Sequence, residues 1–147
     1  MSTTAEAALS ALDAQLRAHL PGWTSYARNR NLPTDVTEAG WVILRNGEPG
    51  TPDLTFSPLR YEFAHRAAVD ILVESHDAAW RDAMLDALKS AVRDAVAADR
   101  TLGGAAQDTR LAPGADIPLE VPEGAAGVLA TRLVIVIDYV TDADPLN

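Results

Sequence analysis

The sequence predicts an α+β fold in which a mixed, largely antiparallel β-sheet packs against two α-helices, with long loops. Three observations predict it. Apolar residues recur at helical spacing near the N-terminus and again over residues 77–100, apolar and polar residues alternate over 60–75, and an apolar run fills 129–140. This order of elements is the α+β arrangement. We expect a single domain over residues 1–147, because that length suffices for one hydrophobic core.

The first helix is expected from four leucines at three- and four-residue steps, which make one apolar stripe on a helix. They are Leu9, Leu12, Leu16 and Leu20. Polar residues from Ser2 to Thr4 offer caps for its start, and Pro21-Gly22 stops it. A short strand is expected at 24–27, followed by an exposed polar loop from Arg28 to Pro33.

Residues 41–44 are expected to form a short strand that ends in a turn at Asn46-Gly47. The alternation over 60–75 then predicts a long, half-buried strand. His65 falls on its inward side, where a hydrogen-bonded histidine of the core or an interface is expected. Asp70 and Glu74 fall on its other side, which we expect to be solvated.

The second helix is expected over residues 77–100, with Asp77 as its cap and Gly103-Gly104 after its end. Its apolar stripe has one residue every four positions: Trp80, Met84, Leu88, Val92 and Val96. Trp80 is expected to anchor the core, and its second interpretation is a residue that contributes strongly to an interface.

Short extended pieces are expected around 108–111 and 117–121, separated by Pro113-Gly114, before the strongest strand at 129–140. Both faces of that last strand are apolar, which favours a central place in the sheet. The predicted core draws on all these elements: Leu9, Leu12, Leu16, Met84, Leu88, Val92, Phe63, Val69, Ile71, Leu133, Ile135 and Ile137.

Composition excludes several function classes. The absence of cysteine removes disulfides, thiolate nucleophiles and cysteine-based metal sites. A formal charge of -9 without a dense basic cluster disfavours nucleic-acid recognition, and no apolar run is long enough to cross a bilayer. The three histidines lack ligand-like spacing, and no nucleophile elbow or phosphate-binding loop occurs. We therefore expect no catalytic residues, no cofactor, no metal and no membrane partner.

Extended polar segments are the remaining feature of the chain. They cover 24–40, 45–58 and 103–127, an unusual share for a compact domain of this size. Two interpretations stay open: plain flexible loops, or contact arms between subunits.

The order of elements and five segments together resemble the tail terminators, or minor tail proteins, of long-tailed phages, prophages and gene transfer agents. The segments are Arg28 to Pro33, Trp41 to Leu44, Ser57 to Tyr61, Ala98 to Gly104 and Asp138-Tyr139. The resemblance covers nearly the whole chain. It implies a structural protein of the virion tail or neck, assembled in the host cytoplasm, and not an enzyme.

The resemblance further implies a homo-oligomeric ring, a hexamer, that caps the tail tube, ends its polymerisation and provides the head-joining surface. Its partners would be the tail tube protein and a head-completion or neck protein, with DNA only as passing cargo. An acidic channel lining would repel that DNA. Two alternatives remain: another neck or head-completion protein of the same particle, and a small enzyme of unrecognised type.

Two groups of charged residues are candidates for the subunit or tube interface. The basic group consists of Arg28, Arg30, Arg60 and Arg66, because arginine forms bidentate pairs with carboxylates of a neighbouring copy. The acidic group consists of Asp108, Asp116, Glu120 and Glu123, which would either pair with these arginines in the next copy or line a channel.

Overall fold

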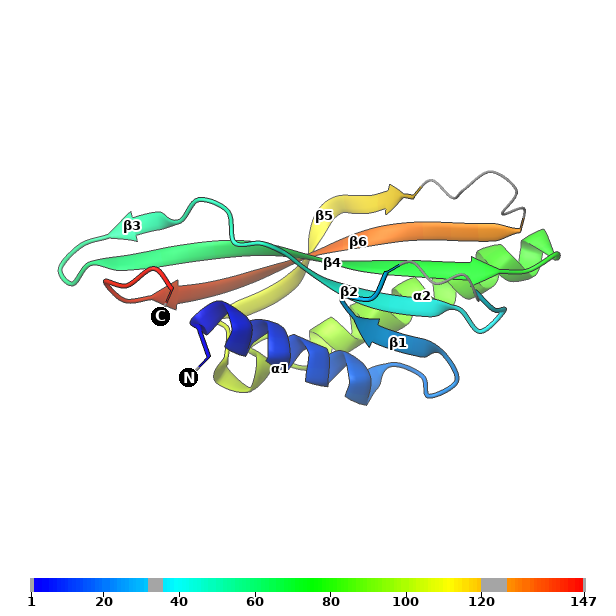
Figure 1. Ribbon diagram of the computed structural model, residues 1–147, viewed down its shortest axis with the longest axis horizontal. Helices are drawn as coiled ribbons and strands as arrows, with labels where there is room; N and C mark the ends of the chain where they lie inside the picture. The colour runs from blue at the N-terminus through cyan, green and yellow to red at the C-terminus, as the bar shows by residue number, and fades with distance from the viewer. Residues whose placement is uncertain (1, 32–35, 120–126, 147) are drawn as a thin grey trace.

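The computed structural model describes residues 2–31, 36–119 and 127–146, with the backbone alone for 114–116. Two α-helices, one short 3-10 helix and six strands follow one another along the chain (Figure 1). They are α1 (Thr4–His19), β1 (Ser25–Arg28), β2 (Trp41–Glu48), β3 (Asp53–Thr55), β4 (Arg60–Glu74), α2 (Ala78–Ala98), η1 (Leu102–Gly104), β5 (Asp108–Pro118) and β6 (Val128–Thr141).

The strands form one six-stranded sheet in the order β1-β2-β4-β6-β5, and β3 adds to the start of β4. The β1–β2 pair is parallel and every other pair is antiparallel. The predicted α+β class, with a mixed and largely antiparallel sheet, is therefore confirmed. The central strand is β4, which pairs with β2 on one side and with β6 on the other. The apolar β6 lies one place away from the centre.

Both helices begin at the caps that the sequence offers. The Thr3 side chain accepts a hydrogen bond from the Glu6 backbone N–H at 3.1 Å, and Asp77 accepts from the N–H groups of Ala79 and Trp80. These side chains satisfy donors that the first turn of a helix leaves unpaired. α1 ends just before Pro21, as expected.

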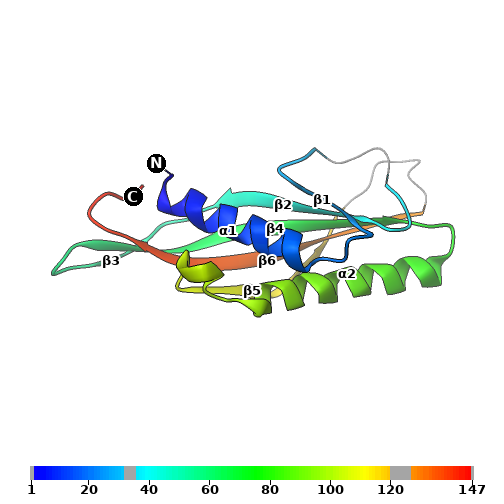
Figure 2. The ribbon, with the colours of Figure 1, turned by 90° about the horizontal axis from the view of Figure 1, so that it is seen from below.

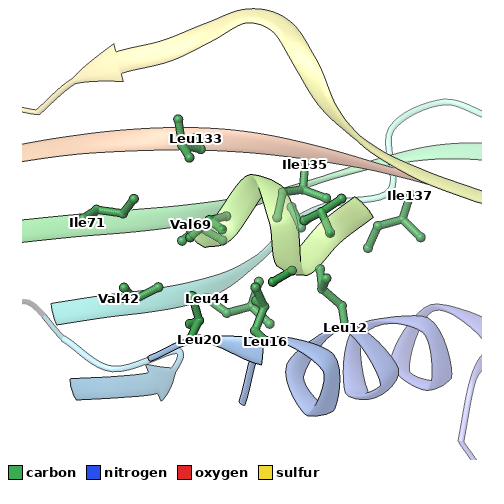
Figure 3. Packing of buried hydrophobic residues seen from close by; sticks show 14 of the residues in the cluster. Leu12, Leu16, Leu20, Val42, Leu44, Val69, Ile71, Leu133, Ile135 and Ile137 are labelled. Carbon is green, nitrogen blue, oxygen red and sulfur yellow. The ribbon is translucent and has the colours of Figure 1, made fainter. Parts of the chain in front are cut away.

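The main core lies between the sheet and the two helices, which cover the same face (Figure 2). Leu12 and Leu16 of α1 project toward Val69 of β4 and Ile135 of β6 (Figure 3). The other face carries a small apolar cluster of Ile43, Leu72 and Ala130. Predicted core residues are buried, except Met84, which is only partly buried.

At two places where we expected the chain to turn out of the sheet, a strand continues. β2 continues through Asn46-Gly47, where we expected a turn, because a bulge between Arg45 and Glu48 absorbs the irregularity. The two pieces expected around Pro113-Gly114 are one strand, β5, with a register shift between Leu111 and Asp116. β5 is an edge strand, and an edge tolerates a proline that cannot donate to a neighbour.

The buried stripe of α2 differs from the predicted one. The buried residues are Leu85, Leu88, Val92, Ala95 and Val96, whereas Trp80 is 45% exposed. Each four-residue step turns about 40° around a helix of 3.6 residues per turn, so residues spaced by four drift off the buried face. Trp80 and Val96, four such steps apart, consequently point in different directions. The expectation that Trp80 anchors the core is wrong.

Asp70 was expected on a solvated face and is instead 1% exposed. It lies on β4 opposite Arg132 of β6, and Arg45 of β2 reaches it from the other side at 3.2 Å. The period-two pattern of β4 correctly separates the two faces. It does not reveal that arginines of both neighbouring strands cover the second face at this position.

Candidate assembly surface

A hairpin projects from one end of the molecule. We call residues 48–62 the arm; it contains β3 and the first residues of β4, and it extends beyond the N-terminal end of α1 (Figures 1 and 2). Asp53–Thr55 pair with Arg60–Glu62 in antiparallel register. The segment 45–58 that we expected to be a loop is thus largely built on strand pairing.

The base of the arm is fixed by a buried polar network. His65 Nε2 donates to the Asn46 carbonyl oxygen at 2.6 Å, and Nδ1 forms a hydrogen bond with the Tyr139 hydroxyl at 2.9 Å. The Tyr139 ring stacks on Phe63 with centroids 5.3 Å apart, and burial raises the pKa of Tyr139. His65 is thus a hydrogen-bonded core residue, as predicted.

The backbone at Gly47 brings the arm close to β4. Gly47 has φ +64°, and a Cβ added there would lie 1.8 Å from the Arg66 carbonyl oxygen. No side chain fits such a contact, so glycine is required for the chain to leave the sheet at this point.

The arm displays large apolar side chains to solvent. Phe56 is 75% exposed and Leu54 is 51% exposed. A hollow of about 280 Å³ is lined mainly by apolar groups, which include Pro49 and Pro52 of the arm and the exposed Leu146. Exposed apolar groups gathered at one end of a protein mark sites of interaction with other proteins.

Arg28 lies at the end of β1 and not in the exposed loop that the sequence predicted. Its two Nη atoms each donate to one Glu6 carboxylate oxygen at 3.0 Å, and its Nε donates to Asn46 Oδ1 at 3.0 Å. The pKa of Glu6 is lowered mainly by the hydrogen bonds from Arg28 and further by the hydrogen bond from Ser10. The Arg28 guanidinium therefore ties α1 to the strands within one chain.

The other three predicted arginines lie apart from Arg28. The Arg30 guanidinium is 4.7 Å from the centre of the Trp41 ring, a cation–π contact, and the Arg30 carbonyl accepts from Arg45. Arg60 begins β4 within the arm, and Arg66 lies further along the same strand; both are exposed. The fold does not gather the four arginines into one cluster.

Of the predicted acidic group, Asp108 pairs within its own chain. Arg100 donates to both of its oxygens at 2.8 and 2.9 Å, and Arg110 reaches it at 3.3 Å. The hydrogen bond from Arg100 is the main cause that lowers the pKa of Asp108. Asp116 lies in β5 with its backbone opposite Leu133. Glu120 and Glu123 lie outside the described residues.

Sequence analysis missed the exposed apolar residues of the arm. Phe56 stands in a stretch rich in proline and glycine, between Gly50 and Pro58, where chains turn and side chains are exposed. An aromatic residue in such a stretch was an available signal. Trp23, 53% exposed after the end of α1, was not singled out either.

The described residues were also considered for a metal site and a membrane-spanning helix. No group of three or more His, Asp or Glu side chains in residues 2–31, 36–119 and 127–146 is arranged to hold a metal ion. Among the same residues no helix combines the length and the apolar character needed to span a membrane.

Comparisons with known proteins find similarity to solved structures. No family model matches the chain, and a search of curated proteins found no match. The chain is similar in structure to the PVC sheath/tube terminator of an extracellular contractile injection system in its extended state, at 16% sequence identity and a TM-score of 0.43. The match covers all of this chain and 62% of the terminator chain. Similarity at this level is too low to transfer function.

Proposed function

We propose that this protein is a structural assembly protein of a phage-type tail. It forms a homo-oligomeric ring, a hexamer, that caps the tail tube, ends its polymerisation and provides the surface for joining the head. The observation that carries the proposal is the arm, which holds Phe56 and Leu54 in solvent on a base fixed by the His65–Tyr139 hydrogen bond. Exposing these apolar side chains to water costs free energy. A protein partner that covered them would remove that cost.

A closed ring needs two different, complementary surfaces on each copy. The arm supplies an apolar surface at one end of the molecule. The exposed Trp80 lies at the other end, where α2 begins (Figure 1). Tryptophan is among the residues that contribute most to protein interfaces. The arm and the Trp80 surface are thus two different surfaces of one copy.

The charge of the chain suits a particle through which DNA passes. A formal charge of -9 repels phosphate, so DNA would slide past the ring without being held. The sequence resemblance to tail terminators supports the same role. The tail tube protein and a head-completion or neck protein are the proposed partners, in the tail or neck of a virion or a related particle.

Negative-stain imaging of purified tail tubes mixed with the protein tests the proposal, together with its mass in solution. We expect rings at one end of each tube, and an arm variant, Leu54→Ser with Phe56→Ser, that folds but forms no rings. Ile117→Ser is the control for the loss of an apolar side chain at the surface, because Ile117 is exposed and lies outside the arm. Binding to portal or neck particles without binding to tubes would instead identify a head-completion protein.

A further inference from the structure

A shallow groove is lined by residues of the last turns of α2, of the segment that follows it and of the edge strand β5. We call it the edge groove; its volume is about 190 Å³. Val96, Ala97 and Leu111 give it an apolar lining, and three arginines line it as well. These are Arg93, Arg100 and Arg110. The groove therefore combines apolar contact with cationic groups in a chain that is acidic as a whole.

Thr109 gives the edge groove an unsatisfied polar group. Its residue is 0% exposed and lines the groove, and its Oγ1 atom has no hydrogen-bond partner among the described residues. A buried hydroxyl without a partner costs free energy.

The three arginines differ in how firmly they are held. Arg100 is bound bidentately by Asp108, and Arg110 is shared between Asp108 and Asp138. Arg93 pairs with its neighbour Asp94, and the two side chains are 63% and 72% exposed. Such an exposed pair contributes little, so Arg93 can turn to another carboxylate.

We propose that the edge groove receives the arm of a second copy of this chain. The inference rests on the proposed function and names the contact that closes the ring. Phe56 of the second copy packs on the apolar lining of the groove at Val96 and Ala97. The carboxylate of Asp53 of the same arm pairs with Arg93. Asp53, Leu54 and Phe56 are all exposed in the isolated chain, so the arm offers the acidic and apolar groups that this groove fits.

The position of the two surfaces determines the kind of assembly. The arm is built on β3 and β4, whereas the edge groove is built on α2 and β5. A contact between different surfaces is heterologous, and repeating it produces a closed ring or an open filament instead of a two-fold dimer. A ring is the arrangement that the proposed function requires.

Disulfide trapping tests the contact directly, because the chain contains no cysteine. Thr55→Cys places a thiol beside Phe56 on the arm, and Ala97→Cys places one in the groove; both positions are exposed. The two single variants are mixed under oxidising conditions, in solution and on tail tubes. Ala83→Cys, exposed on α2 about 21 Å from Ala97 along the helix, replaces Ala97→Cys in the matched control.

We expect a covalent heterodimer from the Thr55→Cys and Ala97→Cys mixture, at a yield at least tenfold above the Ala83→Cys control. Adding Phe56→Ser to the arm variant should return the yield to the control level. The double variant Thr55→Cys with Ala97→Cys should give a ladder of products that stops at the ring size. Crosslinking mainly between two Thr55→Cys chains would show a two-fold contact and overturn the proposal.

The mass and the images of the unmodified protein test the proposed function separately from the arm-in-groove contact. Rings without the expected crosslink would overturn the arm-in-groove contact and leave the proposed function standing. No oligomer in solution or on tubes would overturn both.

Discussion

Asp70 and Arg132 face each other across β4 and β6, with Arg132 Nε donating to Asp70 Oδ1 at 2.6 Å and Nη2 donating to Oδ2 at 3.0 Å. Arg45 of β2 adds a third hydrogen bond at 3.2 Å. One buried carboxylate therefore joins the three central strands. A buried charge is tolerated only when its hydrogen bonds are complete, so the two arginines are required wherever Asp70 is kept.

Arg132→Met should lower the free energy of unfolding by about 3 kcal/mol, because the buried Asp70 loses two of its three hydrogen bonds. Urea unfolding measures the loss. Arg93→Met is the matched control: its pair with Asp94 is exposed, so the change should stay within about 0.5 kcal/mol. A loss below about 1 kcal/mol for Arg132→Met would mean that water solvates Asp70.

Leu88→Ala and Ile135→Ala should each cost about 2 to 5 kcal/mol, because both side chains are fully buried between α2 and the sheet. Thermal or denaturant unfolding gives the value. Leu54→Ala, on the exposed arm, should change stability by less than about 0.5 kcal/mol. Equal effects at the buried and the exposed leucine would contradict the assignment of the core.

Gly47→Ala should destabilise the protein far more than Gly50→Ala. Both glycines have positive φ, +64° and +71°, which costs an L-residue about 1 to 2 kcal/mol. Only the Gly47 Cβ would meet the Arg66 carbonyl oxygen, whereas nothing lies within 4 Å of a Cβ at Gly50. The clash should add roughly 1 to 3 kcal/mol or more. Similar losses in the two variants would indicate that the bulge can move away from β4.

Glu6→Gln should remove a pH-dependent contribution to stability. The pKa of Glu6 is lowered in the folded chain by its hydrogen bonds to Arg28, so this contribution is present above the ordinary value of 4.5 and lost as the pH falls through the folded pKa. At pH 7 the variant should be less stable by up to about 1 kcal/mol, since the Glu6 side chain is 45% exposed. The difference should shrink as the pH falls below 4.5.

The Glu6 prediction has an internal control. In an Arg28→Met background, Glu6→Gln should have little effect at either pH, because the interaction that lowers the pKa is already gone. A difference in stability between the wild-type chain and the Glu6→Gln variant that stays constant from pH 7 to pH 3, or persists without Arg28, would refute this account of the pair.

Local patterns were sufficient for the helices and the long strands. The cap at Asp77, the stop at Pro21 and the alternation over β4 depend on neighbours within a few residues, and all were predicted. Asp70 could not be placed correctly, because its burial depends on Arg45 and Arg132, which lie 25 and 62 residues away in sequence. Pairing between strands creates that environment.

The candidate interface was harder to predict than the fold. Arg28 was chosen for its charge, and its pairing with Glu6, 22 residues away, appears only once β1 packs beside α1. The most exposed apolar residue of the arm, Phe56, carries no charge pattern and no periodicity. Sequence rules built on burial do not identify a residue whose role depends on being left exposed. The interface roles of Arg28, Arg30, Arg60, Arg66 and the acidic group stay predictions.

Tube length is the most direct measure of a protein that ends tail polymerisation. The tail tube protein of the same particle is polymerised alone, with this chain, and with the Leu54→Ser, Phe56→Ser variant, and electron microscopy gives the length distributions. The account predicts shorter tubes, capped at one end, as the wild-type concentration rises, and unchanged lengths with the variant. The contradicting result is defined at wild-type protein concentrations well above the concentration of growing tube ends. If the tubes then keep their length and show no density at their ends, the account is contradicted.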